Sequence, residues 1–456
     1  MKKILIPLLL ASLLLIAACA ADAPGDVATP AAPAAPADPT TPADDTEDAP
    51  PPADTTEDPI TLTFWINDGS PQWMEVWDTV RDNFADVAPH ITIENHGVPW
   101  ADAPNVFNVA AATGTLPDMA HVANLIHTNM INLGVVRNVD DLFATYEGAD
   151  NLLVSHFEFV RGMNQVEDGL WGFPMFGTSH QFWYRTDMFE SAGITEFPTT
   201  WDEWFDAVEA TTRDGHFGFS FRGGPGGWNV MLAFMMAYTD TVDFFDANGV
   251  SFLRRPEALE ALTRYIGIFL NNQAPPTAVG NGYTEMIAEV TSHNAAIVYH
   301  HLQSAELLRE HLAEDLIGYG WIPLNSNGRR IKFDDPQCIA IFNTAAEENM
   351  QAIFEYIRFL WTPEQQFEIV SRAGGVPTNI NTTVDDPFIM MALVQDSDPA
   401  TVSTRFPSYI PGFGPFTNEV LSPNLQAMML GELDPAVAIA QWADDLEAML
   451  AEFLAG

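Results

Sequence analysis

Strand-like and helix-like hydrophobic patterns alternate along residues 60–122, and this alternation constrains the fold more than any other feature of the chain. Residues 60–66 alternate apolar and polar side chains, as half-buried strands do. Apolar residues recur at helical spacing over 73–84, and a second strand is predicted at 91–93. A further helical stretch and a strand at 117–122 follow. Strands that alternate with helices favour a mostly parallel α/β sheet.

Polar and aromatic residues lie at the ends of two of these predicted strands. In an open α/β sheet, ligands bind beyond the carboxyl ends of the strands. This rule selects Trp65, Asn67 and Asp68 at the end of the first strand, and Asn124 after the strand at 117–122. Amide and carboxylate groups supply hydrogen-bond donors and acceptors, so these residues are candidates for binding a polar ligand. Alternatively, Asn67 and Asp68 only cap the helix that follows them.

Residues 171–204 combine a strand, a turn and the start of a helix. A short strand is predicted at 181–184. Pro198 ends the next segment, because the residue before a proline is disfavoured in a helix. Thr200 and Glu203 then form a capping box, which satisfies the unpaired amide groups where a helix starts. The pattern therefore predicts an amphipathic helix directly after Thr200.

The same segment resembles the extracellular solute-binding proteins of ABC importers, in the maltose-binding-protein-like group (family 1) that binds sugars and oligosaccharides. The matching stretches are Leu170–Pro174, Trp183–Phe189, Ala192–Ile194 and Pro198–Glu203. Within them, Arg185 stands where the family usually has Asn. Shorter matches at 317–324 and 374–377 extend the resemblance over about residues 60–450.

The resemblance implies a two-lobed periplasmic-binding-protein-like α/β fold, in which each lobe is a mixed sheet flanked by helices and a hinge joins the lobes. It places the first lobe at 59–172 and 322–376, and the second at 173–321 and 377–456. Hinge crossings are expected near 173–177, 317–324 and 375–378. A small solute, a saccharide in this group, would bind between the lobes. The closed form would be recognised by the permease subunits in the membrane.

Within this resemblance, the second lobe presents an aromatic side chain to the cleft. Trp228 and Asn229 follow a glycine-rich stretch, 223–227, whose backbone can approach a ligand closely. The C–H face of a sugar stacks on an aromatic ring, so Trp228 is expected to contact the ligand. Alternatively, Trp228 is a core residue that opens the apolar helix at 231–238. Gly375 lies in a match to a family segment that borders the cleft and is also an expected site residue.

Two adjacent histidines, His300 and His301, fall at the carboxyl end of a strand predicted at 295–299. Neighbouring residues of a strand point to opposite faces, which argues against both binding one metal ion. His293 adds no helical i, i+4 pair of the kind that zinc sites use. No metal or other cofactor is therefore expected, and one of the two adjacent histidines is expected to hydrogen-bond the solute.

The first 58 residues are predicted to target and tether the chain. Lys2 and Lys3, followed by an apolar run, indicate a signal peptide at residues 1–18. The end of that segment resembles a bacterial lipobox, which would make Cys19 the lipidated first residue of the mature protein; ordinary signal cleavage nearby is the alternative. Residues 19–58 form an acidic linker of Ala, Pro, Asp and Thr, too poor in apolar side chains to fold. An extracytoplasmic protein with a lipid anchor in the cell membrane is expected.

Acidic residues dominate the rest of the chain. Removing Lys2, Lys3 and the ten linker acids from totals of 18 basic and 62 acidic residues leaves 16 and 52, a net charge of −36. Such a surface repels nucleic acids, which are not expected partners. Arg185 and Arg222 are unusual in so acidic a chain. Each could bind a carboxylate such as a uronate, or form a structural ion pair.

Two other functions stay open. The same fold could bind a solute that is not a sugar, such as a polyamine, a metal or a peptide, because fold does not fix function. A membrane-anchored carbohydrate-active hydrolase would need a pair of carboxylates in a cleft. No motif selects such a pair, so a monomeric binding protein without catalytic residues is the favoured interpretation.

Overall fold

The computed structural model describes residues 59–100, 102–163, 168–178 and 180–455. The described residues all belong to one compact unit of the chain. The predicted signal peptide, Cys19 and the linker up to residue 58 therefore lie outside the described residues. Within the described ranges, no helix is long and apolar enough to cross a membrane.

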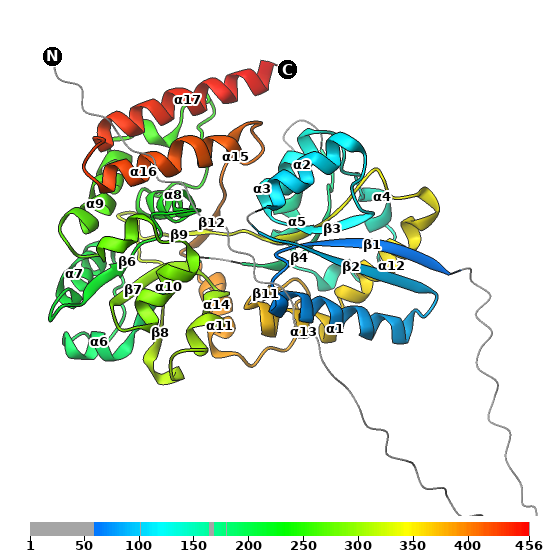
Figure 1. The fold of residues 1–456 in the computed structure, drawn as a ribbon, viewed down its shortest axis with the longest axis horizontal. Helices are drawn as coiled ribbons and strands as arrows, with labels where there is room; N and C mark the ends of the chain where they lie inside the picture. Colours follow the sequence, from blue (N-terminus) through cyan, green and yellow to red (C-terminus); the bar gives the residue numbers. More distant parts are fainter. Residues whose placement is uncertain (1–58, 101, 164–167, 179, 456) are drawn as a thin grey trace, which may run out of the picture. The chain divides into compact units, whose positions relative to one another are not determined.

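Six strands form the larger sheet, in the order β11-β4-β10-β3-β1-β2 (Figure 1). They are β1 (Ile60–Asn67), β2 (Ile91–Val98), β3 (Met119–Val122), β4 (Phe173–Gly177), β10 (Gln337–Ile341) and β11 (Val376–Pro377). β1 pairs in parallel with β2 and β3, which confirms the parallel arrangement expected for the first part of the chain. β10 runs antiparallel to β3 and β4, and β11 antiparallel to β4, so the whole sheet is mixed.

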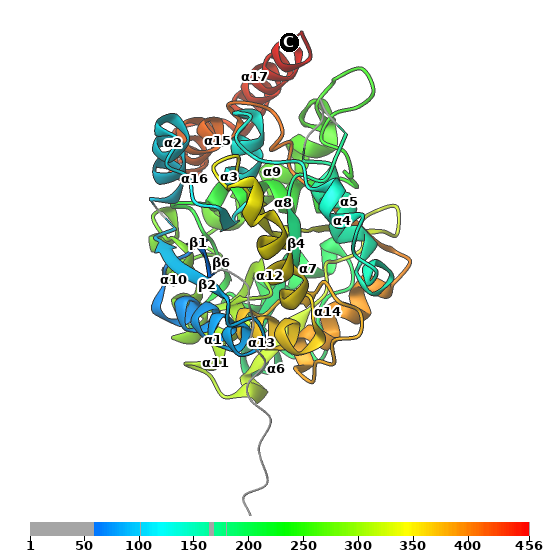
Figure 2. The ribbon, with the colours of Figure 1, turned by 90° about the vertical axis from the view of Figure 1, so that its right-hand side faces the viewer.

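Helices cover both faces of this sheet. They are α1 (Pro71–Val87), α2 (Ala103–Thr113), α3 (Asn124–Asn132), α4 (Asp140–Phe143), α5 (Val154–Arg161), α12 (Met350–Leu360) and α13 (Pro363–Ala373). Both ribbon views place α2 and α3 on one side of β1 and β2 and α1 on the other (Figures 1 and 2). α1 buries Val76, Trp77, Val80 and Phe84, which is the face that the sequence pattern predicts.

Four strands form the second sheet, in the order β6-β7-β5-β8. They are β5 (His180–Arg185), β6 (Phe217–Ser220), β7 (Ala295–His301) and β8 (Ile317–Gly320). β6 and β7 are parallel, whereas β5 is antiparallel to both β7 and β8. A parallel pair, β9 (Arg330–Phe333) and β12 (Thr401–Thr404), lies beside it, and β9 contacts both β5 and α8.

The helices of the second lobe are α6 (Thr186–Ser191), α7 (Trp201–Thr211), α8 (Gly227–Tyr238), α9 (Pro256–Leu270), α10 (Tyr283–Thr291), α11 (Ser304–Arg309), α14 (Pro387–Ser397), α15 (Phe413–Phe416), α16 (Ser422–Met429) and α17 (Pro435–Ala455). The predicted capping box begins α7. Thr200 Oγ1 accepts from Glu203 N at 3.4 Å, and Glu203 Oε2 accepts from Thr200 N at 3.1 Å. The helix then buries Trp201 and Trp204 on its inner face.

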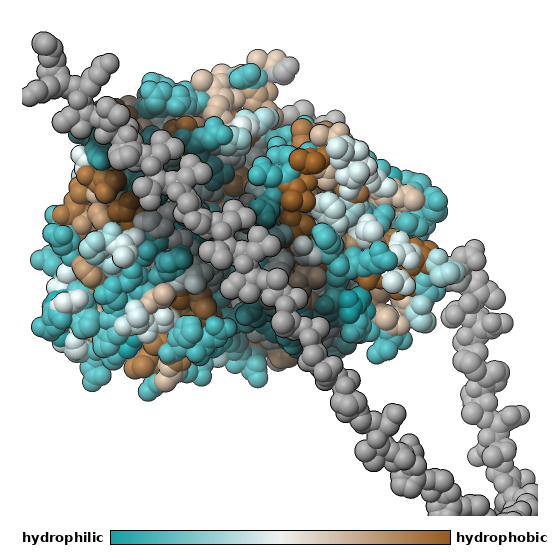
Figure 3. Space-filling model, in the orientation of Figure 1, coloured by the Kyte–Doolittle hydropathy of each residue, from teal (hydrophilic) through white to brown (hydrophobic). Residues whose placement is uncertain are grey.

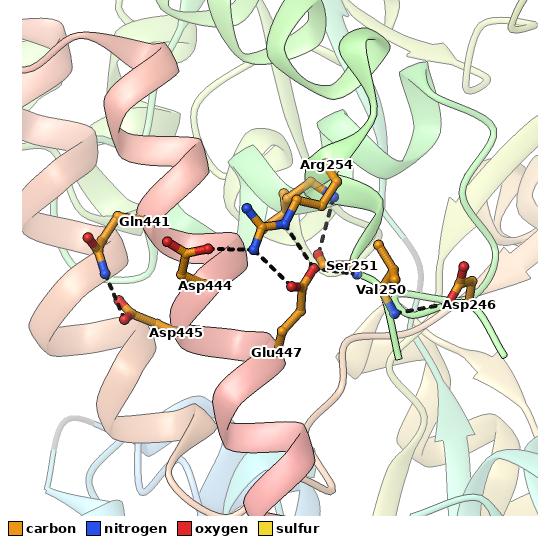
Figure 4. A network of polar contacts seen from close by, with 9 residues as sticks. Asp246, Val250, Ser251, Arg254, Gln441, Asp444, Asp445 and Glu447 are labelled. Atoms are coloured by element: carbon orange, nitrogen blue, oxygen red, sulfur yellow. Dashed lines mark hydrogen bonds and ion pairs between the residues drawn. The ribbon is translucent and has the colours of Figure 1, made fainter. Parts of the chain in front are cut away.

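The C-terminal helix α17 is held by both packing and ion pairs. It buries Trp442 and Leu446 in the second lobe. Arg254, at the end of a 3₁₀ turn, donates to both carboxylate oxygens of Glu447 at 3.1 and 2.8 Å and also pairs with Asp444 (Figure 4). The face of the molecule in Figure 3 is mostly hydrophilic, in keeping with the acidic composition.

These sheets and their helices form the expected two-lobed α/β fold. One hydrophobic cluster joins the first lobe to the second sheet through Trp183, Val298 and Ile317, and another cluster lies within the second lobe. Strand pairing favours lobe boundaries different from those expected. β4 belongs to the first sheet, although residues 173–177 were expected in the second lobe. β9 pairs with β12, although residues 322–336 were expected in the first lobe. We propose that the chain crosses between the lobes after β4, between β9 and β10, and after β11.

Candidate functional site

The first lobe presents the carboxyl ends of β1 and β3 at one edge of its sheet. Asn67 ends β1 and is 1% exposed. Its Oδ1 accepts a hydrogen bond from Ala123 N at 3.2 Å, so it links the ends of the two strands. Its buried Nδ2 has no hydrogen-bond partner among the described residues. Because burying an amide without a partner is unfavourable, Asn67 has the capacity to bind a polar ligand.

Asp68 adopts a backbone conformation that is strained for a residue with a side chain. Its φ is +90°, and such conformations are held in place mainly at functional positions. Its Oδ1 accepts from Ser70 N at 3.0 Å, which turns the chain into α1. Ser70, not Asp68, is the N-cap of α1 and makes no side-chain cap hydrogen bond, so Asp68 shapes the turn before the helix and does not cap it. Asp68 therefore has a structural role, and a ligand contact is compatible with it.

Asn124 lies in the first turn of α3, next to the crossing between β9 and β10. Its buried Oδ1 has no partner among the described residues. Burial raises the pKa of Asp335 in that crossing to about 7, while a hydrogen bond from Asn124 opposes the rise. Asp335 also exchanges two hydrogen bonds with Thr178 in the crossing after β4, each 2.9 Å long. Two crossings are thus joined to each other next to Asn124.

The second lobe presents Arg222 and His300 at the matching edge of its sheet. Arg222 comes two residues after β6, and β6 and β7 are parallel, so their carboxyl ends lie together. Arg222 Nη1 lies 3.2 Å from His300 Nε2. Since a guanidinium can only donate, Nε2 accepts and Nδ1 carries the proton that it donates to Ser304 Oγ at 3.0 Å. Burial, with the neighbouring His301 and Arg222, holds the pKa of His300 well below its usual range.

Aromatic rings pack around His300. The Tyr283 ring stacks on it with centroids 4.7 Å apart, and the His180 ring stacks at 5.7 Å. The His301 ring centroid is only 3.9 Å from that of His300. The expectation that the two adjacent histidines point to opposite faces is therefore wrong, because His301 is the last residue of β7, where the strand alternation ends. Within the described ranges, no cluster of His, Cys, Asp or Glu is suited to hold a metal ion.

The two edges lie close to each other where the lobes meet. Burial raises the pKa of Tyr283 to about 12; the charge of Arg222 opposes this rise and the charge of Asp68, on the other lobe, adds to it. A Cβ at Gly374 of the first lobe would lie 3.0 Å from Gln303 Cα of the second. The polar ends of β1 and β3 and those of β6 and β7 therefore border one interlobe region.

Trp65 and Gly375, two other predicted site residues, serve as packing positions. Trp65 packs against Phe107 and His96, at centroid distances of 5.5 and 5.7 Å. A Cβ at Gly375 would lie 2.5 Å from the ring of Phe176, so the position accepts no side chain. Close packing against β4 thus explains why residue 375 is a glycine, whether or not it contacts a ligand.

Trp228 is buried in the second core. It is 6% exposed, and its ring lies 5.3 Å from that of Phe406 and 6.0 Å from that of Phe413. This is the environment of the core alternative, and contact with a ligand stays a prediction. Asn229, the next residue of α8, has a buried Oδ1 without a partner among the described residues.

Trp100 was missed by the sequence analysis. It is 55% exposed and follows β2, and the other eleven of the twelve tryptophans are buried or partly buried. Asp68 N and Gly69 N both donate to Val98 O at 3.1 Å, which brings the end of β2 beside Asp68. Applying the carboxyl-end rule to β2 as well would have found it. A hollow of about 440 Å³ elsewhere is lined by residues 194–199 and α7. None of the candidate site residues named above lines it.

Arg185 is a structural cation. It is 4% exposed, and its Nε and Nη2 donate to the two oxygens of Asp187 at 2.9 and 2.6 Å. The ion-pair alternative therefore holds for Arg185, whereas Arg222 has no such carboxylate partner among the described residues.

Comparisons with known proteins agree with this geometry. The family model for the bacterial extracellular solute-binding protein matches residues 68–367. A protein of Brucella abortus (strain 2308), named as a binding protein, is 20% identical over 376 residues, 82% of this chain and 89% of its own. A counterpart in Brucella suis biovar 1 (strain 1330) matches to the same extent.

Solved structures share the fold. A chitin oligosaccharide binding protein has a TM-score of 0.74 at 20% identity, covering 87% of this chain and all of that chain. Maltose-bound MalE3 of T. maritima has a TM-score of 0.72 at 19% identity, covering 86% and 100%. A sugar transporter protein of Arthrobacter chlorophenolicus with bound laminaribiose has a TM-score of 0.71 at 17% identity, covering 85% and 99%. With its two lobes, its neighbouring polar edges and a family match over most of its length, this chain belongs to the bacterial extracellular solute-binding proteins.

Proposed function

We propose that this chain is the substrate-binding component of an ABC importer and captures a carbohydrate, an oligosaccharide in the simplest case, between its two lobes. The observation that carries the proposal is the pair of neighbouring polar edges. Asn67, Asp68 and Asn124 on one edge offer amide and carboxylate groups, and Arg222 on the other edge, oriented by His300, offers its guanidinium. Sugar hydroxyls both donate and accept hydrogen bonds, so this mixture suits them.

A sugar-binding site also needs aromatic rings against which the sugar can pack. Trp100 is exposed two residues after Val98, whose carbonyl binds the Asp68 amide, and the Tyr283 ring stacks on His300 at the Arg222 edge. Sugars combine hydroxyl edges with C–H faces that pack on such rings. Related structures named for chitin oligosaccharide, maltose and laminaribiose support a saccharide as the solute class. Delivery would be to permease subunits in the membrane, by a monomer anchored through Cys19.

A thermal-shift and calorimetric screen of the mature protein tests the proposal. Because a ligand that binds only the folded state stabilises it by mass action, a cognate saccharide should raise the melting temperature in a concentration-dependent way. Asn67→Ala should reduce that shift, and the protein should return the saccharide chemically unchanged. A shift given only by a polyamine, a metal ion or a peptide would overturn the carbohydrate assignment. Hydrolysis products would instead indicate an enzyme.

A further inference from the structure

We propose that Arg222 binds a carboxylate of the captured solute, so that the preferred ligand is an acidic saccharide containing a uronic acid unit. This inference rests on the proposed function and narrows its substrate class. Outside the predicted leader and linker, the chain has many more acidic than basic residues. In such a chain, a buried arginine or lysine is expected to form an ion pair with a carboxylate.

The buried cations elsewhere in the second lobe do have carboxylate partners. Arg185 is paired through two hydrogen bonds with Asp187. Lys332, 3% exposed, lies between Asp334 and Asp396. Among the described residues, no carboxylate lies within 4.0 Å of Arg222. Arg222 is therefore a partly buried charge whose counter-ion is missing from the described part of the chain.

The guanidinium of Arg222 is nevertheless held in a fixed orientation. Its Nε donates to Pro225 O at 2.7 Å and its Nη1 to His300 Nε2 at 3.2 Å. Both partners are neutral, because one is a backbone carbonyl and the other an imidazole that accepts the bond. These two bonds use two of the five N–H donors of the side chain. Preorganisation of this kind lowers the entropic cost of binding a planar oxyanion through two parallel hydrogen bonds.

The surrounding backbone favours an anion at this place. The loop at 223–227 is glycine at every position except Pro225, so few side chains cover the guanidinium. A Cβ at Gly226 would lie 2.5 Å from Arg222 Nη2, which shows how closely the bare backbone approaches. α8 begins at Gly227, and the amino end of a helix carries partial positive charge. Burial also lowers the pKa of Arg222 to about 10, as expected for a cation without a full counter-charge.

The neighbouring groups set the chemistry of the ligand. Glu285 acts on Arg222, and Glu306 and Asp68 act on Tyr283, so the solute's carboxylate is expected beside Arg222. The net negative charge of the chain repels highly anionic ligands at long range. A sugar with one carboxylate among several hydroxyls satisfies both conditions. A uronate joined to neutral or mildly acidic units is the class that fits.

Isothermal titration of the mature protein with matched ligands tests this inference. The probes are disaccharides containing glucuronate, galacturonate or mannuronate, each compared with its methyl ester and with a sulfated disaccharide. At least one free acid should bind about tenfold or more tightly than its ester, a difference of ~1.4 kcal/mol or more.

Two variants locate the carboxylate. Arg222→Gln should remove most of the preference for acid over ester, whereas Arg254→Gln, which removes the same charge from the α17 network in Figure 4, should keep it. Equal affinity for acid and ester in the unmodified protein would overturn the inference, whatever the variant does. A preference for the sulfated sugar would overturn the carboxylate. Binding of neutral sugars only would overturn it while leaving the proposed function intact, and binding of no saccharide at all would overturn both.

Discussion

Trp228 and Trp100 show how different the environments of two tryptophans can be at the residue scale. Trp228 is 6% exposed and packs on Phe406 and Phe413, whereas Trp100 is 55% exposed. Trp228→Ala leaves a core cavity and should cost about 3–5 kcal/mol of folding free energy. Trp100→Ala should change stability by less than about 0.5 kcal/mol. Denaturant unfolding of both variants gives these values.

The same variants should separate in affinity. Loss of a stacking ring at Trp100 should weaken saccharide binding by roughly 1–3 kcal/mol, which is about 5- to 150-fold. Affinity measured on the folded fraction of Trp228→Ala tells whether that residue also contacts the ligand. A Trp228→Ala protein of normal stability and much reduced affinity would contradict the core assignment and place Trp228 in the site.

Asp68 combines strain with a position at the first-lobe edge. Its φ of +90° is costly for a residue with a side chain, by about 1–3 kcal/mol, and glycine removes that cost. Asp68→Gly should therefore leave the melting temperature unchanged or higher, despite loss of the hydrogen bond to Ser70 N. Saccharide affinity should fall because the carboxylate is gone.

Asp214 provides the matched control for Asp68. It also has a positive φ, +55°, and is exposed in the turn after α7. Asp214→Gly should likewise not lower the melting temperature, and it should leave affinity unchanged. If Asp68→Gly binds saccharide like the unmodified protein, Asp68 serves only to shape the turn into α1.

At the scale of elements, the capping box of α7 gives a pH-dependent prediction. Hydrogen bonds from the Thr199 hydroxyl and from the backbone amides of Thr199 and Thr200 lower the pKa of Glu203 below 4.5. A carboxyl group whose pKa is lower in the folded than in the unfolded state stabilises the protein at pH values above its unfolded-state pKa. This stabilisation is lost as the pH falls through the folded-state pKa. Glu203→Gln does not titrate. The unmodified protein should therefore lose stability relative to this variant between about pH 5 and pH 3.

Melting temperatures of the two proteins across this pH range measure the effect. Glu209→Gln, an exposed change later in α7, is the control, since Glu209 has no place in the cap. Thr200→Ala should cost about 1 kcal/mol at neutral pH. A constant difference between Glu203→Gln and the unmodified protein at all pH values would contradict the role of the Glu203 charge.

Local patterns predicted elements well where short-range physics determines them. The faces of α1 and α7, the cap at Thr200 and the parallel start of the first sheet follow from periodicity and capping chemistry. The orientation of the His301 ring does not follow from periodicity, because side chains at the end of a strand no longer alternate strictly between its two faces. The burial of Trp228 could not be predicted from local patterns either, since it depends on contacts with Phe406 and Phe413, far along the chain.

At the scale of the whole molecule, the lobe boundaries illustrate what sequence cannot supply. β4 joins the first sheet by pairing with β10, more than 150 residues later in the chain, and β9 finds its partner in β12. Such long-range pairing has no local signal. Arg222 is similar: its lack of a carboxylate partner emerges only when neighbours such as His300 are in place. The residue type alone left both the ligand contact and the ion pair open.

Cys19, which lies outside the described residues, is predicted to carry a lipid anchor. If Cys19 is lipidated, the acyl chains supply the membrane affinity, at ~0.8 kcal/mol per buried CH₂ group, because the acidic body is repelled by anionic lipid surfaces. Expressed in a bacterial host with its own leader, the protein should fractionate with membranes. Cys19→Ala should release the protein or block its processing, while Cys338→Ala, at the other, buried cysteine, should not. Fully processed Cys19→Ala that stays on membranes after a high-salt wash would contradict the lipid anchor, and retention of the unmodified protein under the same wash would show that attachment is not electrostatic.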